Sequence, residues 1–179
     1  MKFRLTDKVP VTIRNANATD ANLLADVASR TFQEAFSSDN TPEDMAAYLA
    51  SAFSVERQSA DLADPAWTVL LAEVDGVAAG YAKLRDGQPT KTVVGAKPVE
   101  LVRLYVLQEW LGRGVGEKLM RACLDEARNA GYKTIWLGVW EHNARAQAFY
   151  RKWNFRAVGE QVFQLGSDPQ RDLVMEREI

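Results

Sequence analysis

From Glu100 to Gly116 the chain reads ELVRLYVLQEWLGRGVG, and this stretch has two halves of different character. Its first half is a run of apolar, β-branched and aromatic residues, which is typical of a buried strand. Its second half is rich in glycine, and a predicted helix, 117–130, follows at once. A helix N-terminus offers unpaired N–H groups and a partial positive charge, and glycine lets a ligand approach the backbone closely. The stretch therefore predicts an anion site, typically for phosphate, at the end of a buried strand.

The spacing of the glycines excludes two common phosphate loops. A Walker loop needs G-x-x-x-x-G-K-[ST], but Glu117 stands five residues after Gly112. A dinucleotide fingerprint needs G-x-G-x-x-G and an acidic residue about 20 positions later. Here the spacing is G-x-G-x-G, and the segment around Trp136 holds no acidic residue. The phosphate ligand must therefore be of another kind.

Composition describes an ordinary globular protein. The 179 residues, with 47% hydrophobic and 26% charged, suit one domain, 1–179. A net charge of −2 gives no case for binding nucleic acid or an anionic membrane. A single cysteine and a single histidine leave no disulfide framework and no Cys/His metal site. We therefore expect no metal cofactor.

The N-terminal residues MKFRLTDKVP hold no apolar signal region, and no run in the chain approaches the length that spans a membrane. A reducing cytoplasm is therefore the expected location.

Hydrophobic periodicity and turn signals predict the order β-α-α-β-β-β-α-β-α-β-β, which describes a mixed sheet flanked by helices. Asp75-Gly76 predicts a hairpin, and the segment 86–98 predicts a flexible loop. We expect strands at 9–13, 67–74, 77–84, 99–107, 133–139, 155–165 and 172–177, and helices after Thr19-Asp20, at 42–53, 55–62, 117–130 and 143–153. The last two strands should form a hairpin across 166–169.

The glycine loop resembles that of the GCN5-related N-acetyltransferases (GNAT superfamily). Their pattern for the pyrophosphate of coenzyme A is Gln/Arg-x-x-Gly-x-Gly/Ala, between a central strand and a long helix. The last two positions match, whereas Leu111 replaces the first, which removes one side chain but leaves the backbone donors. The resemblance implies that the loop binds the coenzyme A pyrophosphate through Gly112, Arg113, Gly114, Val115 and Gly116.

A second motif strengthens the resemblance. The family has Asn-x-x-Ala and then Tyr on the next helix, followed by Gly-Phe. Asn143, Ala146, Tyr150 and Phe155 match, and Asn154 stands in place of the glycine, as the residue that best tolerates a left-handed helix end. The resemblance implies the GNAT fold, an α/β (α+β) structure with a mixed, mostly antiparallel sheet of about six to seven strands and about four helices.

The same resemblance implies an acetyl-CoA-dependent N-acetyltransferase. The strand residues Leu104, Tyr105 and Val106 would splay from the next strand, so that their backbone groups hold the pantetheine arm and the acetyl oxygen. Tyr150 is the candidate general acid for the thiolate, because a phenol with a pKa of ~10 stays protonated at neutral pH. Asn143 would bind the pantetheine amide, or it simply caps its helix.

Glu100 is the candidate general base. It precedes Val106 by six residues, so a period of two places both on one face of the strand. Some members of the superfamily carry a catalytic glutamate there; others use water alone, in which case Glu100 is a surface residue at a strand edge. His142 is expected in an exposed loop, and Cys123 falls on the buried stripe of its helix.

The sequence specifies the amine that accepts the acetyl group less closely than the cofactor. Three stretches resemble bacterial spermidine/spermine N-acetyltransferases: TFQEAFSSDNTPEDMAAYL, LVRLYVL and FQLGSDPQRDLVMER. Acidic residues near the predicted cleft mouth favour a cationic polyamine, although acids at a helix start also serve the helix dipole: Glu34, Asp39, Glu43 and Asp44. Alternatives are a peptide, lysine or antibiotic amine, or a non-catalytic sensor that binds acyl-CoA. The exposed strands of the tail hairpin are compatible with a homodimer.

Overall fold

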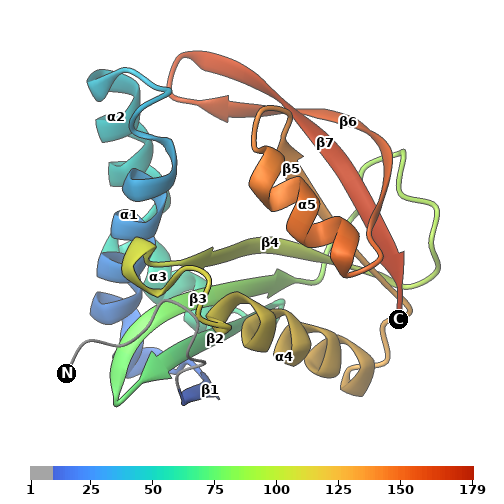
Figure 1. The fold of residues 1–179 in the computed structure, drawn as a ribbon, viewed down its shortest axis with the longest axis horizontal. Helices are drawn as coiled ribbons and strands as arrows, with labels where there is room; N and C mark the ends of the chain where they lie inside the picture. Colours follow the sequence, from blue (N-terminus) through green and yellow to red (C-terminus); the bar gives the residue numbers. More distant parts are fainter. Residues whose placement is uncertain (1–9) are drawn as a thin grey trace.

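The computed structural model describes residues 10–179, which form one seven-stranded sheet with helices on both faces (Figure 1). The sheet order is β1-β2-β3-β4-β5-β7-β6. Only β4 and β5 run parallel, and the other neighbouring strands are antiparallel. The strands are β1 (Val11–Asn15), β2 (Trp67–Val74), β3 (Val77–Arg85), β4 (Pro98–Val106), β5 (Thr134–Trp140), β6 (Arg156–Leu165) and β7 (Asp168–Glu178). The predicted mixed, mostly antiparallel sheet is confirmed.

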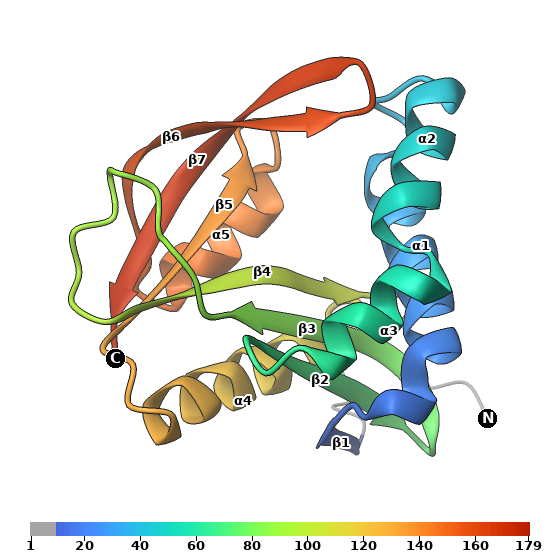
Figure 2. The same ribbon diagram turned by 180° about the vertical axis from the view of Figure 1, so that it is seen from behind.

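The helices divide between the two faces of the sheet (Figure 2). Those of the first third of the chain cover one face, where α1 packs on β3 and β4, while the later two cover the other. The α-helices are α1 (Ala21–Phe36), α2 (Pro42–Ala52), α3 (Val55–Ala63), α4 (Val115–Asn129) and α5 (Ala144–Lys152), and the 3-10 turns are η1 (Ala18–Asp20) and η2 (Gln108–Trp110). We call the two sides the α1 face and the α4/α5 face.

Each face has its own hydrophobic core. The apolar stripe of α4 is buried against β1 to β5, and Cys123 lies within it, where burial raises the pKa of its thiol to about 12. On the other side, Leu24, Val27 and Phe32 of α1 pack against β2 and β3. Both stripes follow the helical period that predicts them.

The starts of α4 and of the first strand differ from the predicted ones. Helix α4 begins at Val115 and not at Glu117, because Gly114 adopts a left-handed φ of 88° and forms the N-cap. The first strand was predicted over 9–13; β1 spans Val11–Asn15, and residue 9 lies outside the described residues. The predicted cap signal Thr19-Asp20 lies at the start of α1, where Asp20 is the N-cap but forms no side-chain cap bond. Asn17, whose side chain accepts from the backbone N–H of Thr19 (2.9 Å), caps the preceding turn η1.

The turn of the tail hairpin is tighter than predicted. The turn consists of Gly166 and Ser167, and β7 already begins at Asp168. Proline is tolerated at position 169 inside β7 because β5 pairs with β7 only as far as Asp172. No strand therefore lies on that side of Pro169 to require its missing N–H.

The predicted flexible loop connects β3 to β4 and packs on the sheet. Val93 is buried against Trp136 of β5 and Val174 of β7, in a small third cluster on the α1 face. The loop therefore covers part of the α1 face over β5 and β7.

Asp44 at the start of α2 holds the tip of the tail hairpin, which lies beside α2 in Figure 2. The backbone N–H of Ser167 donates to Asp44 Oδ1 (2.6 Å), and this bond is the main reason why the pKa of Asp44 lies below its usual value. A Cβ at Gly166 would lie 2.2 Å from the same oxygen, so glycine permits the approach. The carboxylate thus docks two segments that are far apart in the sequence.

We expect Asp44→Ala to increase hydrogen exchange at the Ser167 amide and along the hairpin turn, because that amide loses its acceptor. Exchange in β5 should stay unchanged. The matched control is Glu43→Ala, which removes the neighbouring exposed carboxylate of the same helical turn. Equal protection of the turn in both variants would contradict the docking role.

Candidate active site

Strands β4 and β5 separate in the middle of the sheet. They pair only over Pro98–Glu100 and Thr134–Trp136, although β4 continues to Val106 and β5 to Trp140. Figure 1 shows the two strands diverging beyond this short ladder. The predicted splay is therefore confirmed, and the part of β4 at residues 104–106 has no strand partner on its β5 side.

A cavity of about 1010 Å³ occupies this opening. Its walls come from β4, the glycine loop, β5, α5, α1 and the tail hairpin. The structure brings to it most of the predicted site residues: Glu100, Leu104, Tyr105, Val106, Gly112, Gly114, Gly116, Asn143 and Tyr150. Two predicted residues lie elsewhere. Val115 is buried in the core, and Arg113 lines a neighbouring groove with its guanidinium 5.4 Å from the Trp110 ring.

The glycine loop presents the start of α4 to the cavity. Gly112 and Gly114 have positive φ angles of 75° and 88°, which favour glycine. Gly114 is the N-cap, and it has no side chain that could cap the first N–H groups of α4. A Cβ at Gly116 would meet Phe149 and Val106 only at ordinary distances, 3.7 and 3.8 Å. The loop therefore has the uncapped donors and the backbone shape of an anion site.

We expect Gly114→Ala to weaken coenzyme A binding about tenfold and to lower the free energy of unfolding by ~1–2 kcal/mol, because alanine resists the left-handed backbone. The matched control is Gly131→Ala at the other end of α4, where φ is 85° and a Cβ would meet open space. Calorimetric titration with coenzyme A should separate the two variants, since both carry the same backbone strain. An equal affinity loss in Gly131→Ala would mean that the glycine loop has no special part in binding.

Tyr150 lies on α5 beside the opening of the sheet. It is 9% exposed, and its ring packs edge-on against Phe149 and Phe155. Burial raises the pKa of its hydroxyl, and the nearby Tyr105 and Cys123 add to the effect. The phenol therefore stays protonated at neutral pH, as a general acid must.

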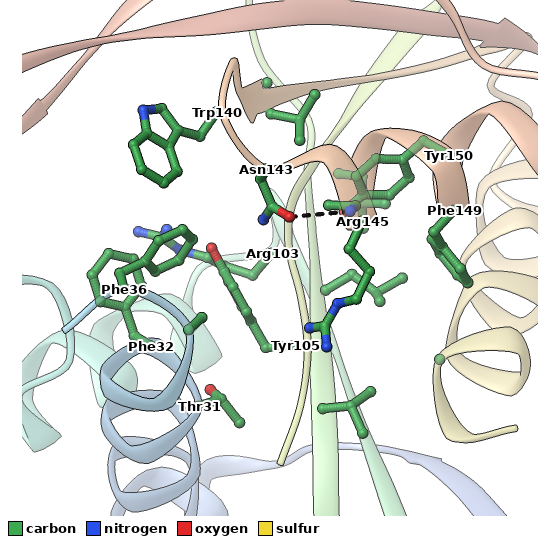
Figure 3. Close-up of a pocket in the computed structure, with 18 of the residues that line it drawn as sticks. Thr31, Phe32, Phe36, Arg103, Tyr105, Trp140, Asn143, Arg145, Phe149 and Tyr150 are labelled. Atoms are coloured by element: carbon green, nitrogen blue, oxygen red, sulfur yellow. Dashed lines mark hydrogen bonds between the residues drawn. The ribbon is translucent and has the colours of Figure 1, made fainter. Parts of the chain in front are cut away.

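Asn143 and Asn154 mark the two ends of α5. Asn143 Oδ1 accepts from the Ala146 backbone N–H (3.1 Å, dashed in Figure 3), so its role as helix cap is confirmed. A bond from Asn143 to the pantetheine amide stays a prediction. Asn154 has a φ of 63°, which confirms the predicted left-handed conformation after the helix.

A β-bulge at Val102 changes the face on which Glu100 lies. Period two places Glu100 and Val106 on one face, and this expectation is wrong. The extra residue reverses the alternation, so Leu101 and Val106 both pack on the α4/α5 face and Glu100 points to the α1 face. The register pairs Lys83 with Arg103 but Leu84 with Leu101.

Glu100 lines the cavity, on the same face of β4 as Arg103. Its carboxylate forms an ion pair with Arg85 of β3 (2.5 Å), and its side chain is 15% exposed. The glutamate is thus inside the strand and not at a strand edge. The ion pair with Arg85 engages the carboxylate, which disfavours a role as general base. That role stays a prediction.

Two cavity residues were missed by sequence reasoning, Arg103 and Asp172. Arg103 stands in the apolar run LVRLYVL, where a cation is out of pattern, and that anomaly was the available signal. Asp172 is 7% exposed and lies next to Trp140 of β5 and Gln161 of β6 in the sheet. Burial raises the pKa of Asp172 to about 6, against opposing effects of Arg103 and Gln161. No local signal marks it, because its neighbours are set by strand pairing.

His142 is exposed, as predicted, with its ring edge-on to Trp140. Within residues 10–179, no group of three or more His, Cys, Asp or Glu side chains is arranged to hold a metal ion. Over the same range no helix has the length and apolar character needed to cross a bilayer. The cytoplasmic location stays a prediction.

Known proteins resemble this chain in sequence and in fold. The model of the acetyltransferase (GNAT) family matches residues 26–155. An uncharacterized N-acetyltransferase of Mycobacterium tuberculosis is 38% identical over 161 residues, covering 90% of this chain and 99% of the relative. The L-amino acid N-acyltransferase MnaT of Escherichia coli is 29% identical over 101 residues, covering 56% of each chain.

Among solved structures, PaiA N-acetyltransferase from Thermoplasma acidophilum in complex with coenzyme A matches with a TM-score of 0.77. The match covers 96% of this chain and 100% of that one at 19% identity, which shows a shared fold. The family model spans the splayed strands, the glycine loop and Tyr150. The chain therefore belongs to the acetyltransferase (GNAT) family and is, by that membership, an acetyl-CoA-dependent N-acetyltransferase.

Proposed function

We propose that the enzyme acetylates the primary amine of a small molecule by direct transfer, with Tyr150 as the general acid. The observation that carries this proposal is the position of the buried Tyr150 beside the opening between β4 and β5. In this arrangement the coenzyme A pyrophosphate lies on the glycine loop at the start of α4, and the pantetheine arm follows residues 104–106 of β4.

In the transfer step one bond forms, one bond breaks and two protons are transferred. The neutral amine nitrogen attacks the thioester carbonyl carbon, so the C–N bond forms and the C–S bond breaks. The electron pair of the C–S bond goes to sulfur, and the hydroxyl of Tyr150 donates a proton to the leaving thiolate. The attacking nitrogen releases its extra proton to a base or to water, and the tyrosinate is reprotonated from solvent. Free backbone N–H groups of β4 polarise the carbonyl oxygen.

A polyamine such as spermidine or spermine is one narrower acceptor candidate. Its support comes from Glu34 and Asp39, which line the cavity. The support is reduced because the backbone N–H of Gln108 already donates to Glu34 (2.7 Å). Asp44 is held by the tail hairpin, so it does not face a substrate freely. Two of the four predicted acids are therefore committed to contacts within the chain.

The proposed reaction is tested by following thiol release from acetyl-CoA with a panel of amines: spermidine, spermine, a lysine peptide, an aminoglycoside and free amino acids. We expect turnover with at least one class of primary amine. Good turnover with other amines and none with polyamines would remove the polyamine candidate. Tight coenzyme A binding with no turnover on any amine would support a sensor, and absence of binding would overturn both readings.

We also propose that the enzyme forms a homodimer through β6. The sheet order leaves β6 as an edge strand, and its Val162 is 72% exposed. Exposed edges pair readily with other strands. Light scattering on the purified enzyme should give the mass of two chains, and a monomer at all concentrations would contradict the proposal.

A further inference from the structure

Arg103 places a cation among aromatic rings at one end of the cavity. Its guanidinium hydrogen-bonds to the hydroxyl of Tyr48 and lies 5.2 to 5.8 Å from the centres of three rings: Phe32, Tyr48 and Phe53. Figure 3 shows Arg103 with Tyr105, Phe36 and Trp140 at this end, away from Phe149 and Tyr150. The cation is thus set into an apolar wall and also lines the cavity.

The neighbouring buried cation is paired with an acid, whereas Arg103 is paired with none of the acids in residues 10–179. Lys83 lies opposite Arg103 in the β3–β4 register, and its ammonium is 2.7 Å from Asp61 Oδ2 and 2.6 Å from Gln58 Oε1. Among residues 10–179, no carboxylate forms an ion pair with Arg103. Its hydrogen bonds go to tyrosine hydroxyls, those of Tyr48 and Tyr105.

A guanidinium in this position is suited to an anionic group of a ligand. It carries five N–H donors in a fork that matches a carboxylate, and two hydroxyls do not use all of them. Burial of a charge is costly unless an opposite charge or hydrogen bonds compensate it. The open donors of Arg103 therefore favour a carboxylate brought in through the cavity.

Asp172 supplies the opposite charge on the same face. A Cβ at Gly138 would lie 3.0 Å from Asp172 Oδ2, so this carboxylate lies over β5 where β5 has already left β4. The positive charge of Arg103 acts on the pKa of Asp172, yet the two side chains form no ion pair. Both groups line the cavity. Two opposite charges thus stand near each other in one cavity and remain out of contact.

We infer that the acceptor is a zwitterion of the α-amino acid type, with its carboxylate on Arg103 and its ammonium on Asp172. This inference rests on the proposed acetyltransferase function and names its acceptor class. Such a ligand fills the gap between the two charges and satisfies both. The ammonium on Asp172 lies at the opening of the sheet, where the thioester arrives. Its side chain would lie against the aromatic wall of Phe36 and Trp140, which favours apolar side chains.

Asp172 can also act as the base that removes a proton from that ammonium. The amine must lose a proton before it attacks, and a carboxylate in contact with it can accept that proton. An N–H bond breaks, an O–H bond forms on Asp172, and the lone pair stays on nitrogen. A polyamine fits this end of the cavity poorly, because one of its cations would lie beside Arg103 without an anion to offset it.

The test uses matched acceptors that differ only at the carboxylate. Phenylalanine, phenylalaninamide and phenethylamine form one series, leucine, leucinamide and isopentylamine form a second, and spermidine is added. We expect kcat/KM for the amino acids to exceed that of their amides and decarboxylated amines by at least ~100-fold, because a site built for a charged group rejects analogues that lack it. Equal or better rates with the decarboxylated amines would overturn the inference while leaving the acetyltransferase proposal intact. No turnover with any amine would overturn both.

A variant assigns the discrimination to Arg103. We expect Arg103→Gln to reduce the preference for amino acid over amide to less than about tenfold, mainly by raising KM for the amino acid. The matched control is Lys83→Gln, which removes the adjacent buried cation on the same face but should keep the preference even if the protein is less stable. Thermal unfolding and coenzyme A titration confirm that each variant is folded. A preference that is unchanged in Arg103→Gln would overturn the assignment.

Discussion

Tyr150→Phe is expected to lower the rate of acetyl transfer by roughly 10²-fold, the lower end of the range for general acid catalysis. The thiolate must then leave without a positioned proton donor. Affinity for acetyl-CoA should change little, because the ring of residue 150 still packs between Phe149 and Phe155. Single-turnover measurement with bound acetyl-CoA and excess amine reports the chemical step, free of product release.

The control for this experiment is Tyr132→Phe. Tyr132 packs at the edge of the same core, and its hydroxyl contacts Asp86, outside the cavity. Its removal should leave the single-turnover rate unchanged. A rate within threefold of wild type in Tyr150→Phe, with normal coenzyme A binding, would show that Tyr150 only packs.

Asp172→Asn is expected to lower kcat/KM by about 10² to 10³-fold, because asparagine can neither pair with an ammonium nor accept its proton. Wild-type activity should fall as the pH drops below about 6, the pKa to which burial raises Asp172. The other groups facing Asp172 do not titrate there: Arg103 stays charged, the pKa of Tyr105 is raised by burial, and Gln161 is neutral. The acid limb at this pH should therefore disappear in the variant.

The same substitution is expected to stabilise the fold at neutral pH. Because the pKa of Asp172 is about 6 in the folded chain against 3.8 for a free side chain, the buried charge disfavours folding above pH 6. That difference corresponds to roughly 2 to 3 kcal/mol, which protonation relieves as the pH falls from 6 to 4. Asp172→Asn should thus gain free energy of unfolding at pH 8, and the gain should shrink towards pH 4.

Urea unfolding at pH 8 and pH 4.5 measures this effect. The comparison is Asp61→Asn, at another buried aspartate. Its charge is paired with Lys83 (2.7 Å), so the protein should lose stability when Asp61 is neutralised. A destabilised Asp172→Asn at pH 8 would mean that its carboxylate is compensated within the fold. If the carboxylate of Asp172 lowers the stability of the fold and faces the cavity, it is available to bind the ammonium group of a ligand.

Local sequence signals predict the elements and the cofactor side of the site. Period 3.6 in α1 and α4, the glycines before α4, and the spacing of Asn143 and Tyr150 are local signals, each carried within a few helical turns or one loop. The left-handed Asn154 follows from the same short-range logic. These features depend on neighbouring residues along the chain, so they can be predicted without strand pairing.

The acceptor side of the site depends on strand pairing and packing between distant segments. The bulge at Val102 turned Glu100 to the α1 face, and a single extra residue of this kind has no clear mark in the sequence. Asp172 reaches the cavity because β7 inserts between β5 and β6, a pairing among distant segments. Arg103 is marked in the sequence as a cation in an apolar strand, but the sequence does not show that the nearby Asp61 pairs with Lys83 and leaves Arg103 without an acidic partner among residues 10–179. Which charged side chains form ion pairs depends on contacts between distant segments of the chain, and these contacts form the acceptor end of the site.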